Sequence, residues 1–457
     1  VLNGEEPRMS GRDSLTAELS RFVLRTNPMP SDMRNVGIRS LLNIIGCAFG
    51  GAHHEATECA YSVAREFAGA PTTTLIGRGK MVDALTGAYL NGLAASAHAF
   101  DDTHLATVVH PAAPVASALF ALADRSALSG EAFLDAFIIG MELECRLAAG
   151  LLLEPARGQW GWYASGITGA IGAAGACARV LGLAEQNTQW AIGIAANQAS
   201  GFRQTHGSMC TSFIPAHAAR CGLHSALLAA NGFTASGAAL EGANGYLDVF
   251  THAPHAAAIT GGLGTDWEVA ANTFKPYPCG IVIHPVLDAC IDIATDPGFD
   301  ISKVADVTLE VDPLCLTLCD NPVPSDSQQA QVSVQHWAAA ALMHGRAGLA
   351  EGGNECVRDP GVIEVRNHVK ATANHQVGRA GAMVTVTLDS GEQRTARVSD
   401  CIGSAARPMN DAQLDAKFAA QAAPLIGEET TATLIRTIRS VHEVGNMAAV
   451  LEACAPT

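Results

Sequence analysis

"SAHAFDDTHLATVVHPAAPVASALFALADR", Ser96 to Arg125, joins two apolar stretches that both have helical spacing. Between His98 and His110 the junction carries two acids, two threonines and three histidines, counting both ends. Proline disfavours helical geometry at the residue before it and fits the first position of a helix. We therefore predict that a helix begins at Pro111, with His110 at or near its N-cap. There the positive end of the helix dipole would favour a neutral imidazole that can act as a base. The alternative is a histidine that only caps the helix or contacts another subunit.

The chain on both sides of this junction has the apolar spacing of helices as far as residue 270. The predicted helices cover residues 14–26, 33–51, 82–98, 130–153 and 165–183. Ser31 and Asp32 precede the second of these, Gly50 and Gly51 end it, and Ser129 precedes the fourth. The glycine-rich stretch 165–183 lacks the preceding strand and the spacing of a nucleotide loop, so we predict a tightly packed interior helix.

The pattern changes near residue 270. Residues 304–318 alternate as a strand does, and residues 381–398 read as two strands joined at Asp389-Ser390-Gly391. Helical spacing returns at 330–345 and again after Pro408. We predict a mainly α protein with a large helical domain (residues 1–270), a smaller α+β domain (271–405), and a helical return (406–457) that docks on the first domain.

Composition and charge exclude several classes of protein. The 457 residues are 48% hydrophobic and 16% charged, with a formal net charge of -16, which opposes binding to nucleic acids or anionic membranes. No apolar run reaches the roughly 18 residues of a spanning helix, and the first residues lack a secretory pattern. The 13 cysteines are scattered singly, without zinc-site spacing. We expect a cytoplasmic protein with reduced thiols and no metal.

Several blocks of the sequence, in their order and spacing, resemble the MmgE/PrpD family. The blocks are "AYLNGLAASAHAFDDTHLATVVHPAAPV", "WAIGIAANQASG", "AHAARCG", "KPYPCGIVIHP", "AQVSVQHWAAAAL" and "RPMNDAQLDAKF". The resemblance implies a cofactor-free, homodimeric enzyme whose site lies in the cleft between a helical domain and an α+β lid. It also implies small carboxylate substrates and lyase or isomerase chemistry (dehydration, decarboxylation or epimerisation) with proton transfer beside a carboxylate.

The resemblance implies roles for His110, Thr103 and Lys275, and the residues themselves suggest roles for Tyr163 and His104. His110 would be the base, Lys275 would hold a substrate carboxylate, and Thr103, Tyr163 and His104 would orient the substrate or deliver a proton. The predicted catalytic residues are His110, Tyr163, Lys275 and His104. The predicted substrate-binding residues are Asp101, Thr103, Arg203, His206, Thr211 and His284.

Structural alternatives remain for several of these residues. At least one of Asp101 and Asp102 could join neighbouring helices, and Thr103 could bond its own backbone. His104 would share a face with Asp101 if the helix persists, and it would be either a second acid or base or a solvated rim residue. Lys275 could be a surface lysine, and His284 could pack on the helix that follows it.

Five positions differ from the family's pattern. They are Ala99 where an acid is usual, Tyr163 and Ile214 for histidines, Thr211 for a lysine, and Leu318 for a tyrosine. Losing a lysine and a histidine removes anion-binding charge, which Arg203, His206 or Arg220 could restore. We therefore expect a substrate with fewer or differently placed carboxylates than citrate-like acids have. The alternative is a non-catalytic dimeric scaffold or carboxylate-binding protein on the same fold. A nicotinamide dehydrogenase is disfavoured because the strand–glycine-loop–helix fingerprint is missing.

Overall fold

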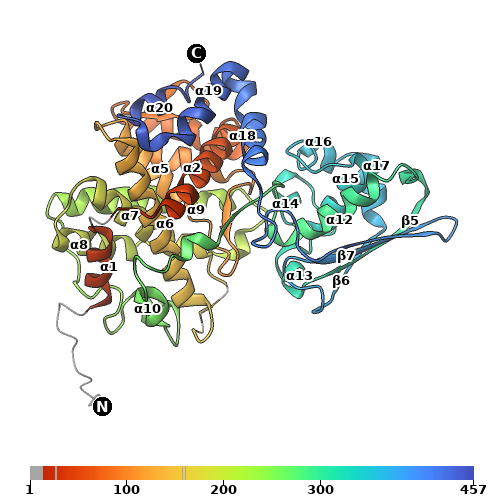
Figure 1. Ribbon diagram of the computed structural model, residues 1–457, viewed down its shortest axis with the longest axis horizontal. Coiled ribbons are helices and arrows are strands. Elements are labelled where there is room, and N and C mark those ends of the chain that lie inside the picture. Colours follow the sequence, from red (N-terminus) through yellow and green to blue (C-terminus); the bar gives the residue numbers. More distant parts are fainter. Residues whose placement is uncertain (1–13, 26–27, 157, 160, 457) are drawn as a thin grey trace.

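The computed structural model describes residues 14–25, 28–156, 158–159 and 161–456. It has a larger helical lobe and a smaller lobe with a sheet (Figure 1). Each lobe has its own hydrophobic core, one formed by residues within 15–274 and 409–454 and the other by residues within 277–401. The chain therefore crosses between the lobes twice. The predicted fold class, mainly α with a smaller α+β domain, is confirmed.

The larger lobe is built from helices and two short strand pairs. Its helices are α1 (Leu15–Val23), α2 (Ser31–Gly51), α3 (Glu55–Phe67), α4 (Ala84–Ser96), α5 (Ala112–Ala123), α6 (Gly130–Leu152), α7 (Ala164–Val180), α8 (Glu185–Ala196), α9 (Cys210–Ala230), α10 (Tyr246–Phe250), α11 (Ala256–Thr260), α18 (Asp411–Ile426), α19 (Glu428–Arg439) and α20 (Ala448–Glu452). The strand pairs are β1 (Thr73–Leu75) with β2 (Lys80–Val82), and β3 (Asp102–His104) with β4 (Asn272–Phe274).

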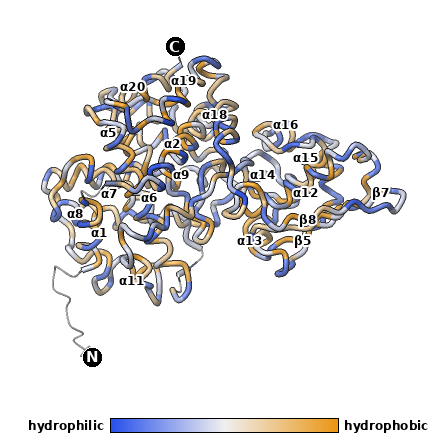
Figure 2. Tube along the Cα trace, in the orientation of Figure 1, coloured by the Kyte–Doolittle hydropathy of each residue, from blue (hydrophilic) through white to orange (hydrophobic). Residues whose placement is uncertain are grey.

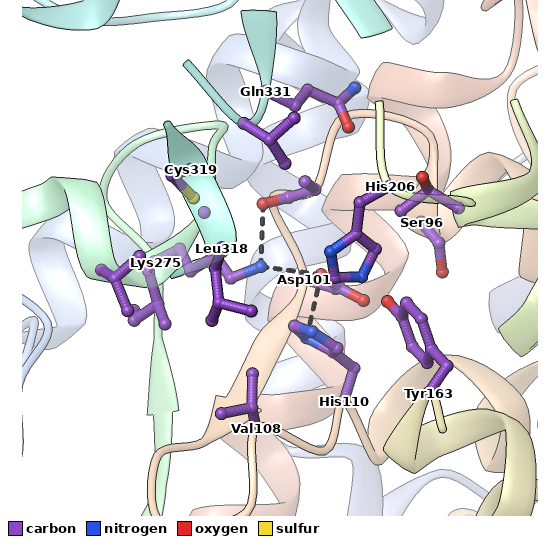
Figure 3. A pocket seen from close by; sticks show the side chains of 16 residues that line it. Ser96, Asp101, Val108, His110, Tyr163, His206, Lys275, Leu318, Cys319 and Gln331 are labelled. Atoms are coloured by element: carbon purple, nitrogen blue, oxygen red, sulfur yellow. Dashed lines mark hydrogen bonds and ion pairs between the residues drawn. The ribbon is translucent and has the colours of Figure 1, made fainter. Parts of the chain in front are cut away.

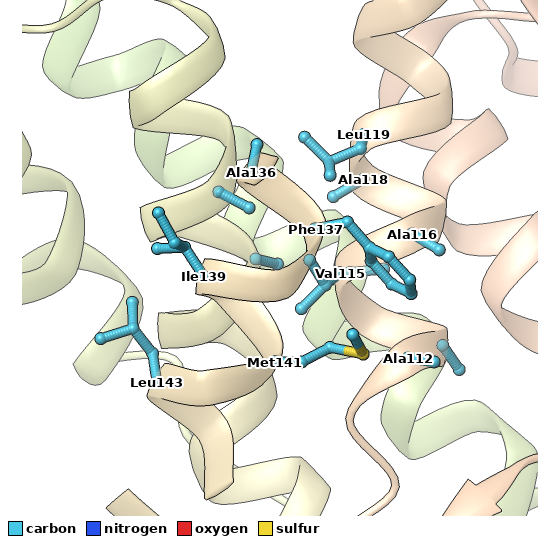
Figure 4. Close-up of a cluster of buried hydrophobic side chains, with 14 of the residues drawn as sticks. Ala112, Val115, Ala116, Ala118, Leu119, Ala136, Phe137, Ile139, Met141 and Leu143 are labelled. Atoms are coloured by element: carbon cyan, nitrogen blue, oxygen red, sulfur yellow. The ribbon is translucent and has the colours of Figure 1, made fainter. Parts of the chain in front are cut away.

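Helix α7 lies in the interior of this lobe and packs against α5, α6, α8 and α9. The glycine-rich helix can approach its neighbours closely because so few of its side chains extend far from the backbone. At Gly222 of α9 an added Cβ would lie 2.4 Å from the Ala173 side chain of α7. The predicted interior helix is confirmed, because every residue from Ala164 to Ala178 is buried. Figure 4 shows the same core where side chains of α5 and α6 meet.

The smaller lobe contains a four-stranded sheet, in the order β6-β5-β7-β8. Its strands are β5 (Val304–Val311), β6 (Val369–Ala373), β7 (Ala382–Leu388) and β8 (Gln393–Val398). Its helices are α12 (His284–Ala294), α13 (Pro313–Cys319), α14 (Ser327–Ala330), α15 (Val334–His344), α16 (Asn354–Val357) and α17 (Pro360–Asn367). β5 pairs parallel with β6 and antiparallel with β7, and β7 and β8 form the predicted hairpin. In Figure 2 the tube is hydrophilic at the far tip of the smaller lobe, beside the β7 label.

Two sequence predictions differ from the observed elements. The single strand predicted for residues 304–318 is wrong, because the strand ends at Val311 and α13 follows. The Asp312 side chain accepts the Leu314 N–H (2.9 Å) and Pro313 takes the first helical position, so both residues start a helix there. In addition, α2 begins at Ser31 itself, with Pro30 at its N-cap, rather than after Asp32.

The helical return joins the larger lobe through α18, which packs against α2. The Asn410 and Gln413 side chains form a capping box at its start. The buried ammonium of Lys417 donates to Asn43 Oδ1 (2.7 Å) and to the carbonyls of Phe100 (2.6 Å) and Lys275 (2.9 Å). This one side chain therefore joins α18 to α2, to the junction after α4 and to the crossing after β4. No helix in the described ranges is long and apolar enough to cross a membrane.

Candidate active site

The junction between α4 and α5 contains a short strand rather than a continued helix. β3 pairs with β4 so that Asp102 lies opposite Phe274. The prediction that Asp101 and His104 would share a helix face if the helix persisted does not apply, because α4 already ends at Ser96. Pro111 is the N-cap of α5, so His110 lies one residue before the cap. The Asp102 carboxylate accepts the Ala112 N–H (3.3 Å) and supplies the cap that proline cannot.

A pocket lies where this junction meets the smaller lobe, and we call it the central pocket. Its empty volume is about 630 Å³. It is lined by Ser96, Ala99, Asp101, Val108, His110, Tyr163, His206 and Thr211 from the larger lobe and by Lys275, Gly280, Ile281, Val282, Leu318, Cys319, Gln331 and Val332 from the crossing and the smaller lobe. Figure 3 shows side chains of both lobes facing the same space.

The Asp101 carboxylate joins the two candidate catalytic groups of the pocket. Its Oδ1 lies 3.2 Å from Lys275 Nζ and 3.5 Å from His110 Nδ1, as the dashed lines in Figure 3 show. Lys275 also donates to the Ala99 carbonyl (2.9 Å) and is only 1% exposed. An ammonium has three N–H donors, so the third finds no acceptor among the described residues. That donor is available to an anion in the pocket.

His110 is a neutral imidazole with one basic nitrogen left free. Its Nδ1 lies 2.8 Å from the Asp102 carbonyl, which can only accept, so Nδ1 carries the proton. Nε2 then keeps its lone pair, and the ring lines the pocket. Burial lowers the pKa of His110 to about 4, and the Lys275 charge acts in the same direction against the Asp101 carboxylate. Burial of the ring therefore favours the predicted neutral state.

Tyr163 and His206 form the neighbouring wall. Their rings meet edge to face at 5.3 Å, and the Tyr163 ring lies 6.1 Å from that of His110. Burial raises the pKa of the Tyr163 phenol above its ordinary value, so it remains a proton donor at neutral pH. Burial and the Arg203 charge lower the pKa of His206 to about 4, which leaves this ring neutral.

Four predicted site residues lie outside the lining of the central pocket. Thr103 is behind His110, with its Oγ1 3.2 Å from Nδ1. His104 contacts Thr107 Oγ1 (2.8 Å) and Glu268 Oε2 (3.4 Å) instead. Arg203 donates from Nε to the Trp162 carbonyl (3.1 Å) and lines an adjoining cleft that also contains His206.

The fourth residue, His284, is fully buried, and its ring packs edge to face on Tyr277 at 5.3 Å. Burial lowers its pKa well below the ordinary value. The structure therefore places this histidine against Tyr277, at the start of α12 and outside the lining of the central pocket. Within the described ranges, no group of three or more His, Cys, Asp or Glu side chains is placed to hold a metal ion.

Four of the five positions that depart from the family's pattern line the central pocket. They are Ala99, Tyr163, Thr211 and Leu318, whereas Ile214 is buried in α9. These departures therefore change the chemistry of the pocket itself. Ala99 and Val108 also have left-handed backbones, with φ of 50° and 57°. For a β-branched residue such as Val108 this conformation is strained, and strain of this kind concentrates at functional sites.

Sequence reasoning missed Ser96 and Gln331. The Ser96 hydroxyl is buried at the pocket wall without a hydrogen-bond partner in the described part of the chain. Gln331 donates to the Ala97 carbonyl (2.8 Å) and faces the pocket from the smaller lobe. Neither residue has a signal in the sequence that separates it from other polar residues in apolar stretches.

The N-terminal domain of the MmgE/PrpD family matches residues 17–258, and its C-terminal domain matches residues 277–443. The chain belongs to the MmgE/PrpD family. Its curated relatives include the cis-aconitate decarboxylase-like protein oryM of Aspergillus oryzae, 29% identical over 293 residues (60% of this chain and 61% of that protein). The cis-aconitate decarboxylase of Aspergillus terreus is 28% identical over 295 residues (61% and 60%). The human cis-aconitate decarboxylase is 24% identical over 426 residues (89% and 87%). This MmgE/PrpD chain thus spans about 60% of the fungal relatives in these matches.

Proposed function

We propose that this MmgE/PrpD chain is an enzyme that transfers a proton at the carbon beside a carboxylate of a small carboxylic acid. The reaction class is a lyase of the decarboxylase or dehydratase type, with isomerase chemistry as the second candidate. The observation that carries the proposal is the Lys275–Asp101–His110 chain in one pocket, which combines a cation, a carboxylate and a neutral base. The names of the curated relatives support this class.

Lys275, His110 and Asp101 have different roles in the proposed reaction. The remaining N–H of Lys275 binds a substrate carboxylate, which fixes the adjacent carbon in the pocket. His110 Nε2 takes the proton from that carbon. The electron pair of the broken C–H bond remains on the carbon beside the carboxylate. The imidazolium that forms lies 3.5 Å from the Asp101 carboxylate, which stabilises its charge. Proton transfer by a positioned group of this kind typically contributes about 10²–10⁴-fold to the rate.

The Tyr163 phenol is the proton donor on the neighbouring wall, with its ring 6.1 Å from that of His110. It hydrogen-bonds the part of the substrate that gains negative charge or leaves. Three outcomes fit this arrangement. After His110 has taken the proton, the electron pair can expel a hydroxyl that leaves as water with a proton from Tyr163, or the carbon can take a proton back. In decarboxylation no proton is removed first: the C–C bond breaks, carbon dioxide leaves, and the remaining electron pair takes a proton from Tyr163. Decarboxylation is the first reaction to assay, because the curated relatives carry that name.

The charge of the pocket limits the substrate. Among the described residues that line it, Lys275 is the one cationic side chain and Asp101 the one carboxylate, so their charges offset each other. His110 and His206 are neutral above their pKa of about 4. A tricarboxylate would therefore place three negative charges against little positive charge. We infer that the substrate carries one or two carboxylates.

The test is proton exchange. The protein is incubated in deuterated water with a panel of small mono-, di- and tricarboxylates, cis-aconitate included, and NMR follows exchange and product while carbon dioxide release is measured separately. We expect exchange or turnover of at least one mono- or dicarboxylate, and its loss in His110→Ala but not in His375→Ala, which alters an exposed histidine. Binding without exchange or turnover across the panel would favour a non-catalytic carboxylate-binding protein. We also expect a homodimer, which light scattering tests.

A further inference from the structure

A second cavity adjoins the central pocket, and we call it the side chamber. Its empty volume is about 470 Å³, and it is lined by Leu105, Val108, Ile281, Val282, Leu314, Arg379, Ala380, Cys401 and Ser404. Val108, Ile281 and Val282 line both spaces. The two cavities therefore share part of their walls.

The lining of the side chamber suits an apolar occupant. Most of its side chains are aliphatic. Ser404 is one polar exception, and its Oγ already accepts the Arg407 N–H (3.2 Å). Arg379 is the other, and it is exposed where the chamber meets the adjoining cleft. A group bound here would form few hydrogen bonds, and its binding would be favoured mainly by the transfer of its apolar surface out of water.

The wall between the two cavities contains a residue with a strained backbone. Val108 has a φ of 57°, and such a conformation costs on the order of 1–3 kcal/mol. Two backbone hydrogen bonds hold it: Val108 N–H to the His104 carbonyl (2.8 Å) and His104 N–H to the Val109 carbonyl (2.9 Å). The turn places an aliphatic side chain two residues before His110, at the entrance of the side chamber. Figure 3 shows Val108 beside His110.

We propose that the substrate is a carboxylic acid with an alkyl substituent, whose acid end lies between Lys275 and His110 and whose alkyl group lies in the side chamber. This proposal rests on the proposed function for the position of the acid end. The adjoining cleft is the poorer place for the alkyl group because its lining includes Arg203, Gln204, Asp320 and Asn321.

The experiment measures binding of a homologous series to the full chain by calorimetry. The probes are succinate and 2-alkylsuccinates with methyl, butyl and hexyl groups. Burying one methylene favours binding by about fourfold, so we expect affinity to rise by about that factor per added methylene until the chamber is filled. Ala380 lines the chamber but not the central pocket. Ala380→Phe should abolish the gain and leave succinate binding unchanged, whereas Ala380→Ser should keep the gain.

Leu314→Trp would fill the chamber with a side chain from α13. It replaces Ala380→Phe in the experiment if that variant does not fold. The proposal is overturned if affinity does not increase along the series, if no member binds, or if the folded chamber-filling variants keep the full gain. Its failure can be told from failure of the proposed function. If exchange depends on His110 but affinity does not change with chain length, only the proposal for the side chamber is wrong. If affinity rises with chain length but no exchange or turnover occurs, only the proposed enzymatic function is wrong.

Discussion

The Lys275 ammonium lies 3.2 Å from the Asp101 carboxylate, and both side chains are buried, at 2% and 6% exposure. The two residues are far apart in the sequence and belong to the junction after α4 and to the crossing after β4. Removing one partner of a buried ion pair leaves an uncompensated charge, which typically costs about 3–5 kcal/mol. The pair therefore matters both for stability and for the site.

Asp101→Asn should lower the free energy of unfolding by about 3 kcal/mol, and Lys275→Met by a similar amount. The double variant should cost clearly less than the sum, since no charge is left unpaired. Urea unfolding of the four proteins measures this coupling. Additive losses would show that the pair does not interact. All three variants should also lose proton exchange, because each removes a group of the site.

The pH dependence of activity should reflect the pKa of about 4 at His110. The base is neutral above that value, so kcat/KM should stay level from about pH 5 to pH 7 and fall only at more acid pH. An ordinary histidine would instead give an inflection near pH 6.5. Because the Asp101 charge favours the imidazolium, the pKa of His110 should fall further in Asp101→Asn, which NMR titration of the imidazole measures without needing activity. An inflection near 6.5 that belongs to His110 would contradict the buried neutral base.

The contribution of His336 to stability should rise between about pH 4 and pH 6.5. Burial lowers the pKa of His336 to about 4, so the unfolded chain binds its proton first as the pH falls. The stability due to the neutral ring is complete above 6.5 and is lost as the pH falls to about 4. His336→Gln should reduce this slope by about 1.4 kcal/mol per pH unit. Asp102 acts in the opposite direction, because burial and the Asp101 charge raise its pKa to about 7. An unchanged slope in His336→Gln would contradict the assignment.

Gly222→Ala should destabilise the larger lobe by about 1–3 kcal/mol. The added methyl would lie 2.4 Å from the Ala173 side chain and 2.7 Å from the Ala170 carbonyl, so α7 and α9 would have to separate. Gly445→Ala is the matched control, since nothing lies within 4 Å of its added Cβ. Thermal unfolding of both variants checks this, and equal melting temperatures would contradict close packing of the two helices.

Lys417→Met should lower the free energy of unfolding by about 3 kcal/mol, since three buried acceptors lose a charged donor. It should also reduce kcat, although Lys417 does not line the central pocket. The reason is that two of its acceptors are the carbonyls of Phe100, next to Asp101, and of Lys275 itself. Steady-state kinetics of the folded variant separate the two effects, and an unchanged kcat would restrict Lys417 to stability.

The helices were predictable from the sequence because their signals are local. Ser129 starts α6 by accepting the Ala132 N–H (3.2 Å), and the β7–β8 hairpin turns at Gly391 with a φ of 83°. The β5–β6 pairing was not predictable, because Val307 meets Val369 across a long intervening segment. Likewise, α13 depends on Asp312 and Pro313, whose helix-starting chemistry interrupts an otherwise alternating pattern.

The sequence predicted which residues cluster at the site, but not the directions of their side chains. Polar residues within an apolar stretch marked the junction around His110. The direction of each side chain depends on the pairing of β3 with β4, which turns His104 toward Glu268. The resemblance to the family indicated which positions matter, and four altered positions do line the pocket. Ser96 lines the central pocket because it is the last residue of α4, and no pattern in the sequence indicates that the helix ends there.

The two crossings between the lobes lie side by side. A Cβ added at Gly403, on the returning crossing, would lie 2.5 Å from the Phe274 carbonyl and 2.7 Å from Pro276 on the outgoing one. Lys275 lies between Phe274 and Pro276, the two residues of the outgoing crossing that Gly403 approaches. The cation that would bind the substrate is therefore part of the covalent connection between the lobes, at the place where the two crossings touch.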